Sequence, residues 1–328
     1  MVGQVDELVV VDDGSSDETA AVLGNLPYAN LRVLHNARQC GVSHSFNTAV
    51  EATTADILFI QGGDDRSAPD RVARQLQSFE DGGTILSASV PFVVNEAGSS
   101  LPAWAASEFL PGNESFDNLV QLFSVGNMIC APSVAVRRFD YLKHGGFHIG
   151  LNHLQDYHLW LKLAEWGQFD VLAEPVVSYR KHSSNLSRDY LGIDSPVLRR
   201  KRAELDFILT DFLGSATSRS LDRLAAASDV DLTAFQGLDR AEQVAVLELS
   251  HHDRLLMRHG LAFVFRKLGE DRGLEALERM GLSPADLDGL ATRADHNNGE
   301  DVARALAVRA HHDALASQRT TRRKKNTP

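Results

Sequence analysis

The sequence is poor in cysteine and contains no long apolar run. Among its 328 residues only Cys40 and Cys130 are cysteines. Two thiols provide no disulfide framework, and their scarcity indicates a reducing compartment. No stretch approaches the ~18 consecutive apolar residues of a membrane-spanning helix, and no secretory signal is visible. These absences predict a cytoplasmic protein without a membrane span.

Positive charge is scarce as well. The formal net charge is -11 at pH 7, which argues against a general nucleic-acid binder because that role needs a basic surface to neutralise phosphates. One cluster of basic residues lies at 319–325, inside the polar tail 319–328. We expect this tail to be disordered and solvated, with contact to an anionic membrane surface as the alternative.

Apolar residues make up 43% of the sequence, enough for a sizeable core. Short apolar runs at 8–11 and 57–60 each lead into acidic residues and glycine, and helical periodicity follows both runs. A strand at 31–34 completes the order βαβαβα up to about residue 80. This order predicts an α/β fold with a mainly parallel wound sheet, buried and flanked by helices.

Local signals place further elements. We expect strands at 84–90, near 133–136 and over 171–179, and a helix over 154–164. Ser15 and Glu18 have the spacing of a capping box, which predicts a helix that begins there.

The pattern changes after about residue 190. Beyond it Leu, Ala, Arg, Glu and Asp recur at helical spacing, with glycine turn signals between the segments. We therefore predict an α/β domain over residues 1–189, a helical accessory region over 190–318 and the basic tail over 319–328.

Two His-His-Asp sequences, at 251–253 and 311–313, lie in the helical region. Adjacent residues on a helix point to different faces, so they do not readily chelate one ion. We expect both sequences on solvated helix surface.

Two acid pairs stand where predicted strands end. Asp12 and Asp13 follow the first apolar run, and Asp64 and Asp65 follow the later one after two glycines. Ligands of such sheets bind at the carboxyl ends of strands. The glycines permit a sharp turn, and the carboxylates are hard oxygen ligands suited to Mg²⁺ or Mn²⁺. The alternatives are a solvated turn for the second pair and helix capping for the first.

These acid pairs belong to an ordered set of motifs. The set comprises Val10-Val11-Asp12-Asp13-Gly14-Ser15-Ser16-Asp17, Asn36 through Gly41-Val42-Ser43 to Asn47, Gly62-Gly63-Asp64-Asp65 with Pro69, Gly145-Gly146-Phe147, Gln155-Asp156-Tyr157-His158-Leu159-Trp160-Leu161, and Tyr179-Arg180-Lys181-His182. Each motif is weak alone, but the set in this order resembles the family-2 glycosyltransferases with the A-type nucleotide-sugar fold. The resemblance covers about residues 7–187.

The resemblance implies an inverting, metal-dependent enzyme. It would move a sugar from a nucleoside diphosphate donor, UDP-linked, to the hydroxyl of a glycan or lipid-linked acceptor. The implied setting is surface polysaccharide assembly, in the cytoplasm and peripheral to the inner face of the membrane.

On the donor side, the resemblance implies a role for each acidic pair. Asp64 and Asp65 would hold Mg²⁺ or Mn²⁺ against the phosphates, with Asp65 as the direct ligand. Asp12 and Asp13 would lie at the nucleotide, where Asp13 accepts a hydrogen bond from the base. His182 would lie near the diphosphate or the metal; the alternative for it is a surface loop histidine.

On the acceptor side, the resemblance gives Asp156 the role of general base. A hydroxyl is a poor nucleophile at neutral pH, so it needs a carboxylate within hydrogen-bond reach. From the residues alone, Asp156 is equally an ordinary acid in the first turn of a helix.

Three features depart from the family pattern. The family has a strand and a helix before the first acidic motif, whereas Met1 lies six residues before Glu7. Gly62 replaces a first aspartate and Gln155 replaces a glutamate; we expect Asp64 and Asp65 still to hold the metal and Gln155 to alter the acceptor side.

Two rival hypotheses stay open. The short N-terminus is compatible with a non-catalytic nucleotide-binding or scaffold module. A nucleotidyltransferase would also use carboxylate-bound magnesium, but it ordinarily has a glycine-rich, basic phosphate loop that this sequence does not contain.

Overall fold

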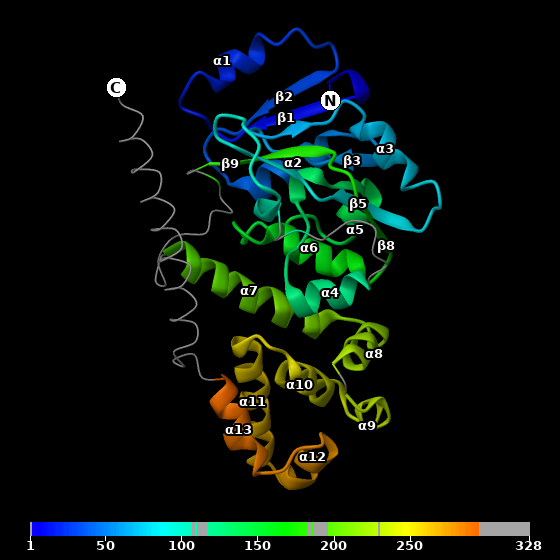
Figure 1. Cartoon of the computed structure of the whole chain (residues 1–328). Coiled ribbons are helices and arrows are strands. Elements are labelled where there is room, and N and C mark those ends of the chain that lie inside the picture. The colour runs from blue at the N-terminus through cyan, green and yellow to red at the C-terminus, as the bar shows by residue number, and fades with distance from the viewer. Residues whose placement is uncertain are drawn as a thin grey trace, which may run out of the picture. The chain divides into compact units, whose positions relative to one another are not determined.

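The computed structural model describes residues 2–106, 109, 117–182, 185, 196–228 and 230–294. The chain forms two compact units (Figure 1), one of Met1–Arg188 with Phe207–Ala227 and one of Asp189–Asp206 with Ser228–Pro328. Helix α7 (Pro196–Ser215) therefore contributes residues to both units. The predicted boundaries at residues 189 and 318 stay predictions, and the predicted basic tail lies outside the described residues.

All described strands lie in the first unit. They are β1 (Leu8–Asp12), β2 (Leu31–His35), β3 (Ile57–Phe59), β4 (Arg66–Ser67), β5 (Thr84–Ser89), β6 (Phe92–Asn95), β7 (Ala135–Arg137), β8 (Gln168–Leu172) and β9 (Val177–Lys181). They form three sheets with the orders β1-β2, β3-β7-β5-β8 and β4-β9-β6. The pairs β1–β2, β5–β8 and β6–β9 are parallel, whereas β3–β7, β5–β7 and β4–β9 are antiparallel.

Helices flank these sheets (Figure 1). Those of the first unit are η1 (Val2–Gln4), α1 (Thr19–Gly24), α2 (Val42–Ala52), α3 (Arg71–Gln77), η2 (Ala103–Ala106), α4 (Asn118–Val125), η3 (Ala131–Ser133), α5 (Arg138–Lys143), α6 (Gln155–Ala164) and α8 (Ser218–Ala227), with the C-terminal part of α7. The predicted α/β class is confirmed. Apolar runs indicate strands covered on both faces, but they do not fix the direction of the neighbouring strand, and β7 runs antiparallel to both β3 and β5.

The predicted capping box at Ser15 and Glu18 is wrong. Helix α1 begins only at Thr19, and Glu18 precedes it without a side-chain cap. The N–H of Ser15 instead donates to Asp12 Oδ1 at 3.0 Å. A turn closed by an aspartate side chain thus takes the place of the first helical turn.

The predicted strand over 171–179 is two strands, β8 and β9. The chain bends between them at residues 173–176, where Pro175 has no N–H to donate to a ladder. The break matters for the site, because β8 extends the sheet beside β5 whereas β9 runs between β4 and β6.

Strands β1 and β3 are less buried than predicted. Both are mainly half-buried, whereas all six residues of β5 are buried. Among the described strands, β1 pairs only with β2 and β3 only with β7, while β5 has a neighbour on each side. Burial therefore follows the number of strand neighbours as well as the apolar pattern.

Helix α6 lies in the core of the first unit. Tyr157, Leu159 and Trp160 are at most 1% exposed, and the Tyr157 hydroxyl donates to the carbonyl of Leu122 in α4 at 2.8 Å. A helix that is buried on most of its sides is held firmly by its neighbours. The first turn of α6, which carries Asp156, is therefore fixed in position.

The second unit is helical in its described residues. Its helices are α9 (Leu232–Gln236), α10 (Arg240–Ser250), α11 (Arg254–Leu268), α12 (Gly273–Arg279) and α13 (Asp286–Ala294), with the N-terminal part of α7. The predicted helical character after residue 190 is confirmed for these residues. None of the helices that the structure describes is long and apolar enough to cross a membrane.

The surface prediction for the first His-His-Asp sequence is wrong for His251. Its ring is 8% exposed and stacks on His252 at 4.4 Å. His251 Nδ1 accepts the N–H of Asp253 at 2.9 Å, and Asp253 caps the first turn of α11. The sequence spacing did not indicate this capping turn. The second copy, at 311–313, lies outside the described residues.

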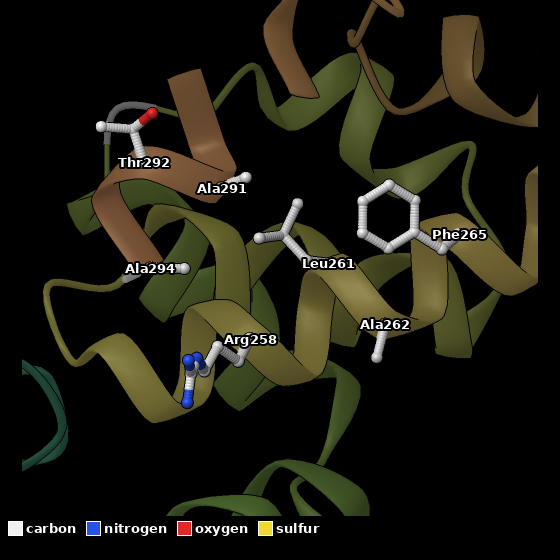
Figure 2. A pocket seen from close by; sticks show the side chains of 7 residues that line it. All are labelled: Arg258, Leu261, Ala262, Phe265, Ala291, Thr292 and Ala294. Atoms are coloured by element: carbon white, nitrogen blue, oxygen red, sulfur yellow. The ribbon is translucent and has the colours of Figure 1, made fainter. Parts of the chain in front are cut away.

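A hollow of about 560 Å³ lies between α11 and α13 of the second unit. Figure 2 shows Arg258, Leu261 and Phe265 along α11, with Ala291 and Ala294 coming from α13. The lining contains no carboxylate, histidine or cysteine. It therefore lacks the side chains that the predicted chemistry requires, and the candidate site lies in the first unit.

Candidate active site

The second acid pair lies in a tight turn after β3. The N–H of Asp65 donates to the carbonyl of Gly62 at 3.4 Å, which folds the Asp65 side chain back over the turn. A Cβ atom on Gly62 would lie 2.6 Å from Asp65 Oδ2, whereas one on Gly63 would meet nothing within 4 Å. Gly62, where the family pattern has an aspartate, thus leaves space for the Asp65 carboxylate.

Residues at the end of β9 contact both Asp64 and Asp65. The N–H of Arg180 donates to Asp65 Oδ1 at 2.8 Å, and His182 Nε2 lies 2.7 Å from Asp64 Oδ2. Arg180 Nε also donates to the carbonyl oxygen of Asp64 at 2.9 Å. The structure therefore brings together three of the predicted site residues, Asp64, Asp65 and His182, from segments that are far apart in the sequence.

The electrostatic setting of Asp65 is unusual. Burial raises the pKa of the Asp65 carboxyl to about 6; the Arg180 N–H opposes this shift, and the negative charge of Asp64 adds to it. Two adjacent carboxylates in a partly desolvated turn repel each other. A cation bound there would relieve that repulsion.

Asp156 stands in the first turn of α6 and is 9% exposed. Its Oδ2 accepts from Asn127 Nδ2 at 3.0 Å, and its Oδ1 accepts the N–H of Tyr157 at 2.8 Å. The helix N-terminus favours the ionised carboxylate. Sequence reasoning missed Asn127, because a polar residue after a helix carries no signal of the distant side chain that it contacts.

The thiol of Cys130 is influenced by the charges of both Asp156 and Asp65. Its thiol is 2% exposed, and its pKa is raised by burial first and then by the negative charges of Asp65 and Asp156. Both carboxylates therefore lie within electrostatic reach of one buried thiol. This places the predicted base and the predicted metal ligand in the same region of the first unit.

Asp13, at the end of β1, holds the loop before α2. Its Oδ1 accepts from Asn36 Nδ2 at 2.7 Å and from the N–H of Cys40 at 2.9 Å, and its Oδ2 accepts the N–H of Gly41 at 2.8 Å. Burial raises the pKa of Asp13, but these hydrogen bonds outweigh it and the net shift is downward. The segment from Asn36 to Gly41 is thus held by hydrogen bonds to the first acidic motif.

Asp12 has local partners. It is 6% exposed, and its Oδ2 lies 3.2 Å from His35 Nδ1 at the end of β2. The hydrogen bond from Ser15 is the main cause that lowers the pKa of Asp12. These contacts neither include nor exclude a nucleotide, so the predicted nucleotide roles of Asp12 and Asp13 stay predictions.

The side chain of Asn47 contacts the Gly145-Gly146-Phe147 segment that precedes α6. Its Oδ1 accepts from the Phe147 N–H at 3.0 Å and from the Tyr141 hydroxyl at 2.7 Å. Gly146 has φ +63°, and a Cβ there would lie 2.8 Å from the same oxygen. The Asn47 and glycine motifs therefore work as one structural unit that positions the segment leading into α6.

The side chains of the acid turn are too few to complete the coordination of a divalent ion by themselves. In the described part of the chain, no three His, Cys, Asp or Glu side chains gather closely enough to hold an ion by themselves. Asp64, Asp65 and His182 offer carboxylate oxygens and an imidazole, which are donor types that Mg²⁺ and Mn²⁺ accept. Any ion here would take its remaining ligands from water or from a bound molecule.

Comparison with known proteins points to the same family as the ordered motifs. Residues 2–146 match the family model described as glycosyl transferase family 2. This N-terminal part of the chain is therefore similar to family-2 glycosyltransferases, and two of the similar proteins are named glycosyltransferases. The prediction of a transferase is thereby confirmed.

Several known proteins are similar to this chain. An uncharacterized protein of Mycobacterium tuberculosis is 28% identical over 67% of this chain and 70% of its own length. An uncharacterized glycosyltransferase of Methanocaldococcus jannaschii is 25% identical over 53% of this chain and 59% of its own length. The succinoglycan biosynthesis protein ExoO of Rhizobium meliloti is 28% identical over 31% of this chain and 29% of its own length. The chain spans less than two thirds of the length of the latter two proteins.

The fold resembles that of TarS from Staphylococcus aureus. The crystal structure of TarS residues 1–349 in complex with UDP-GlcNAc matches with a TM-score of 0.54 at 16% identity, covering 88% of this chain and 81% of that chain. The structure in complex with UDP matches with a TM-score of 0.50 at 15% identity. At this identity the likeness concerns the fold alone, and it confirms the predicted nucleotide-sugar transferase fold class.

Proposed function

We propose that this chain transfers a sugar, with inversion, from a UDP-sugar to the hydroxyl of a glycan or lipid-linked acceptor. The observation that carries the proposal is the convergence of Asp64, Asp65 and His182 at the ends of β3 and β9. That TarS was crystallised with UDP and UDP-GlcNAc supports the class of donor. The similarity to ExoO, named for succinoglycan biosynthesis, supports a role in polysaccharide assembly. We propose further that the product is a surface polysaccharide and that the chain acts at the inner face of the membrane.

In the proposed reaction Asp156 is the general base. The acceptor oxygen attacks the anomeric carbon from the face opposite UDP, and the bond from that carbon to the phosphate oxygen breaks with its electron pair leaving on UDP. The Asp156 carboxylate takes the proton of the acceptor hydroxyl. The Asn127 amide and the Tyr157 N–H hold that carboxylate in one orientation, so little reorganisation is needed at the moment of transfer.

The proposal includes Mg²⁺ or Mn²⁺ at Asp64 and Asp65. When bound with the donor, such an ion supplies positive charge to the departing diphosphate. The repulsion between the two carboxylates supports this part of the proposal. His182 would stay close to Asp64 and add a neutral or positive group beside the phosphates.

Removing the metal should weaken donor binding. We expect UDP-sugar binding, measured by calorimetry in Mg²⁺ or Mn²⁺, to weaken by about tenfold or more in chelator and in Asp65→Ala, because the diphosphate would then face unneutralised carboxylates. Asp70→Ala is the matched control, since Asp70 is exposed and lies 3.9 Å from Arg74. Donor affinity that is unchanged in chelator would refute the metal assignment.

The transfer itself is tested by a donor screen. The full chain is incubated with a panel of UDP-sugars and with glycan and lipid-linked acceptors, and UDP release is recorded. We expect release with one donor, dependent on the acceptor and lost in Asp65→Ala. Absence of both UDP release and UDP binding across the panel would instead favour a non-catalytic module.

A further inference from the structure

Arg71, the first residue of α3, is a fully buried charge beside the acid turn. Its side chain is 0% exposed. The Nε group donates to Gln75 Oε1 at 2.9 Å. The Nη1 group donates to Gln61 Oε1 and Ser67 Oγ, both at 3.0 Å. The Nη2 group donates to two carbonyls, those of Ile60 and Val134, both at 3.0 Å. All five N–H groups of the guanidinium are therefore satisfied.

These contacts fix the end of β3. The Arg71 guanidinium lies 5.7 Å from the centre of the Phe59 ring and bonds to the next two residues, Ile60 and Gln61. The Gln61 amide is held again by the Ser67 hydroxyl at 2.6 Å. The chain passes from this fixed segment directly into the turn of Asp64 and Asp65.

Gln75 extends the network to the middle of the four-stranded sheet. It is fully buried, and its Nε2 donates to the carbonyls of Ser87 at 3.0 Å and Ser133 at 2.9 Å. Strand β5, the segment before β7, helix α3 and the end of β3 are thus joined through two side chains. A rigid base of this kind restricts the position of the turn that it supports.

The Arg71 charge has no direct ion pair among the described residues. All five acceptors are neutral, and a buried arginine is ordinarily paired with a carboxylate, because burying an unpaired charge is costly. Burial lowers the pKa of Arg71 to about 10, so the group stays protonated at neutral pH, and Asp65 is among the negative charges that oppose this shift. The positive charge is therefore available to an anion bound at the turn.

We propose that Arg71 is a positioning residue of the donor site: it holds the acid turn in place and supplies a buried positive charge that favours the diphosphate of UDP. The inference rests on the proposed function. It predicts that the Arg71 charge strengthens the binding of ligands that carry phosphate and does not change the binding of uridine.

The experiment compares UDP with uridine on the full chain. Binding of each is measured by calorimetry or ligand-observed NMR, with folding checked by thermal unfolding, for Arg71→Met, Arg71→Lys and Gln61→Glu. Arg71→Met removes the charge, and Arg71→Lys keeps it with fewer donors. Gln61→Glu keeps the size of the side chain and pairs the guanidinium with a carboxylate, although it loses the hydrogen bond from Gln61 Nε2 to the Gly62 carbonyl at 3.3 Å. It remains informative if Arg71→Met fails to fold.

We expect Arg71→Met and Gln61→Glu to weaken UDP binding by roughly tenfold relative to uridine binding, the scale of one unit charge at about 10 Å in a protein interior. Arg71→Lys should keep the wild-type ratio. A folded Gln61→Glu variant with an unchanged ratio would show that Arg71 is structural only, and would overturn this inference alone. A wild-type chain that binds neither ligand would overturn the proposed function, and this inference with it.

Discussion

Asp156 is the residue on which the proposed mechanism depends most. Asp156→Asn keeps the shape of the side chain but removes the basic oxygen, so turnover should fall by ~10²-fold or more, the usual scale of general-base catalysis. UDP affinity should change little, because the base faces the acceptor. Steady-state UDP release and calorimetry measure the two quantities on the same variant.

Gln155→Glu is the control for that substitution. It restores the family pattern beside the base and should keep the protein active. If Asp156→Asn turned over at a near-normal rate while Gln155→Glu lost activity, the base would lie elsewhere.

The two glycines of the acid turn offer a matched pair of variants. Gly62→Ala would place a Cβ 2.6 Å from Asp65 Oδ2 and must displace that carboxylate, whereas Gly63→Ala meets nothing within 4 Å. A side-chain end moves easily, so thermal stability should change little in either variant. Because the displaced atom is a proposed ligand atom, we expect kcat/KM to fall about tenfold or more in Gly62→Ala only. Equal activity in the two variants would contradict the role of Asp65.

At the scale of elements, the packing of α11 on α10 depends on Gly260. A Cβ at this position would lie 2.8 Å from Leu249 Cγ and 2.9 Å from the carbonyl oxygen of Ala245. Backbone cannot move aside as a side-chain end can, so Gly260→Ala should destabilise the second unit by about 1–3 kcal/mol. Urea denaturation measures this change in the free energy of unfolding.

Gly289 in α13 is the matched control. A Cβ there meets nothing within 4 Å, and alanine is a better helix former than glycine, so Gly289→Ala should stabilise by about 0.5–1 kcal/mol. A stabilising Gly260→Ala would show that α10 and α11 can separate at no cost.

At the scale of the whole molecule, the first unit needs residues well beyond 189. Arg223 in α8 makes two hydrogen bonds to the Asp117 carboxylate, at 2.5 and 3.0 Å. Asp211 in α7 lies 3.0 Å from His158 Nε2 in α6 and 3.1 Å from Lys162 Nζ. These contacts anchor α4 and α6, and α6 carries the proposed base.

A truncation series tests this dependence. A chain ending at residue 227 should stay folded and bind UDP, because it keeps both contacts. A chain ending at 189 should melt at a lower temperature and lose affinity, since the buried His158 and the half-buried Lys162 would lose their acidic partner. Thermal unfolding measures the stability of the two truncated chains, and calorimetry measures their affinity for UDP. Equal stability of the two would support the predicted domain boundary at residue 189.

The sequence by itself carried the resemblance to family-2 glycosyltransferases, the α/β class and the order of the acidic motifs. These depend on local patterns: apolar runs give strands, and glycine with aspartate at their ends gives turns. The same local reasoning failed where a competing local interaction prevailed. The N–H of Ser15 bonds to the Asp12 side chain and not within a capping box, and Pro175 lies where residues 171–179 divide into β8 and β9.

Only the tertiary structure decided which partners the site residues have. Arg180 holds both acids of the turn, Asn127 orients Asp156, and Arg71 satisfies all five of its N–H groups beneath the turn. A buried polar group must find partners wherever the fold brings them, and the partners of Asp156 and of the acid turn lie 29 and more than 100 residues away in the sequence. Periodicity and spacing carry no information about such contacts, because they arise only when the sheets and helices pack together.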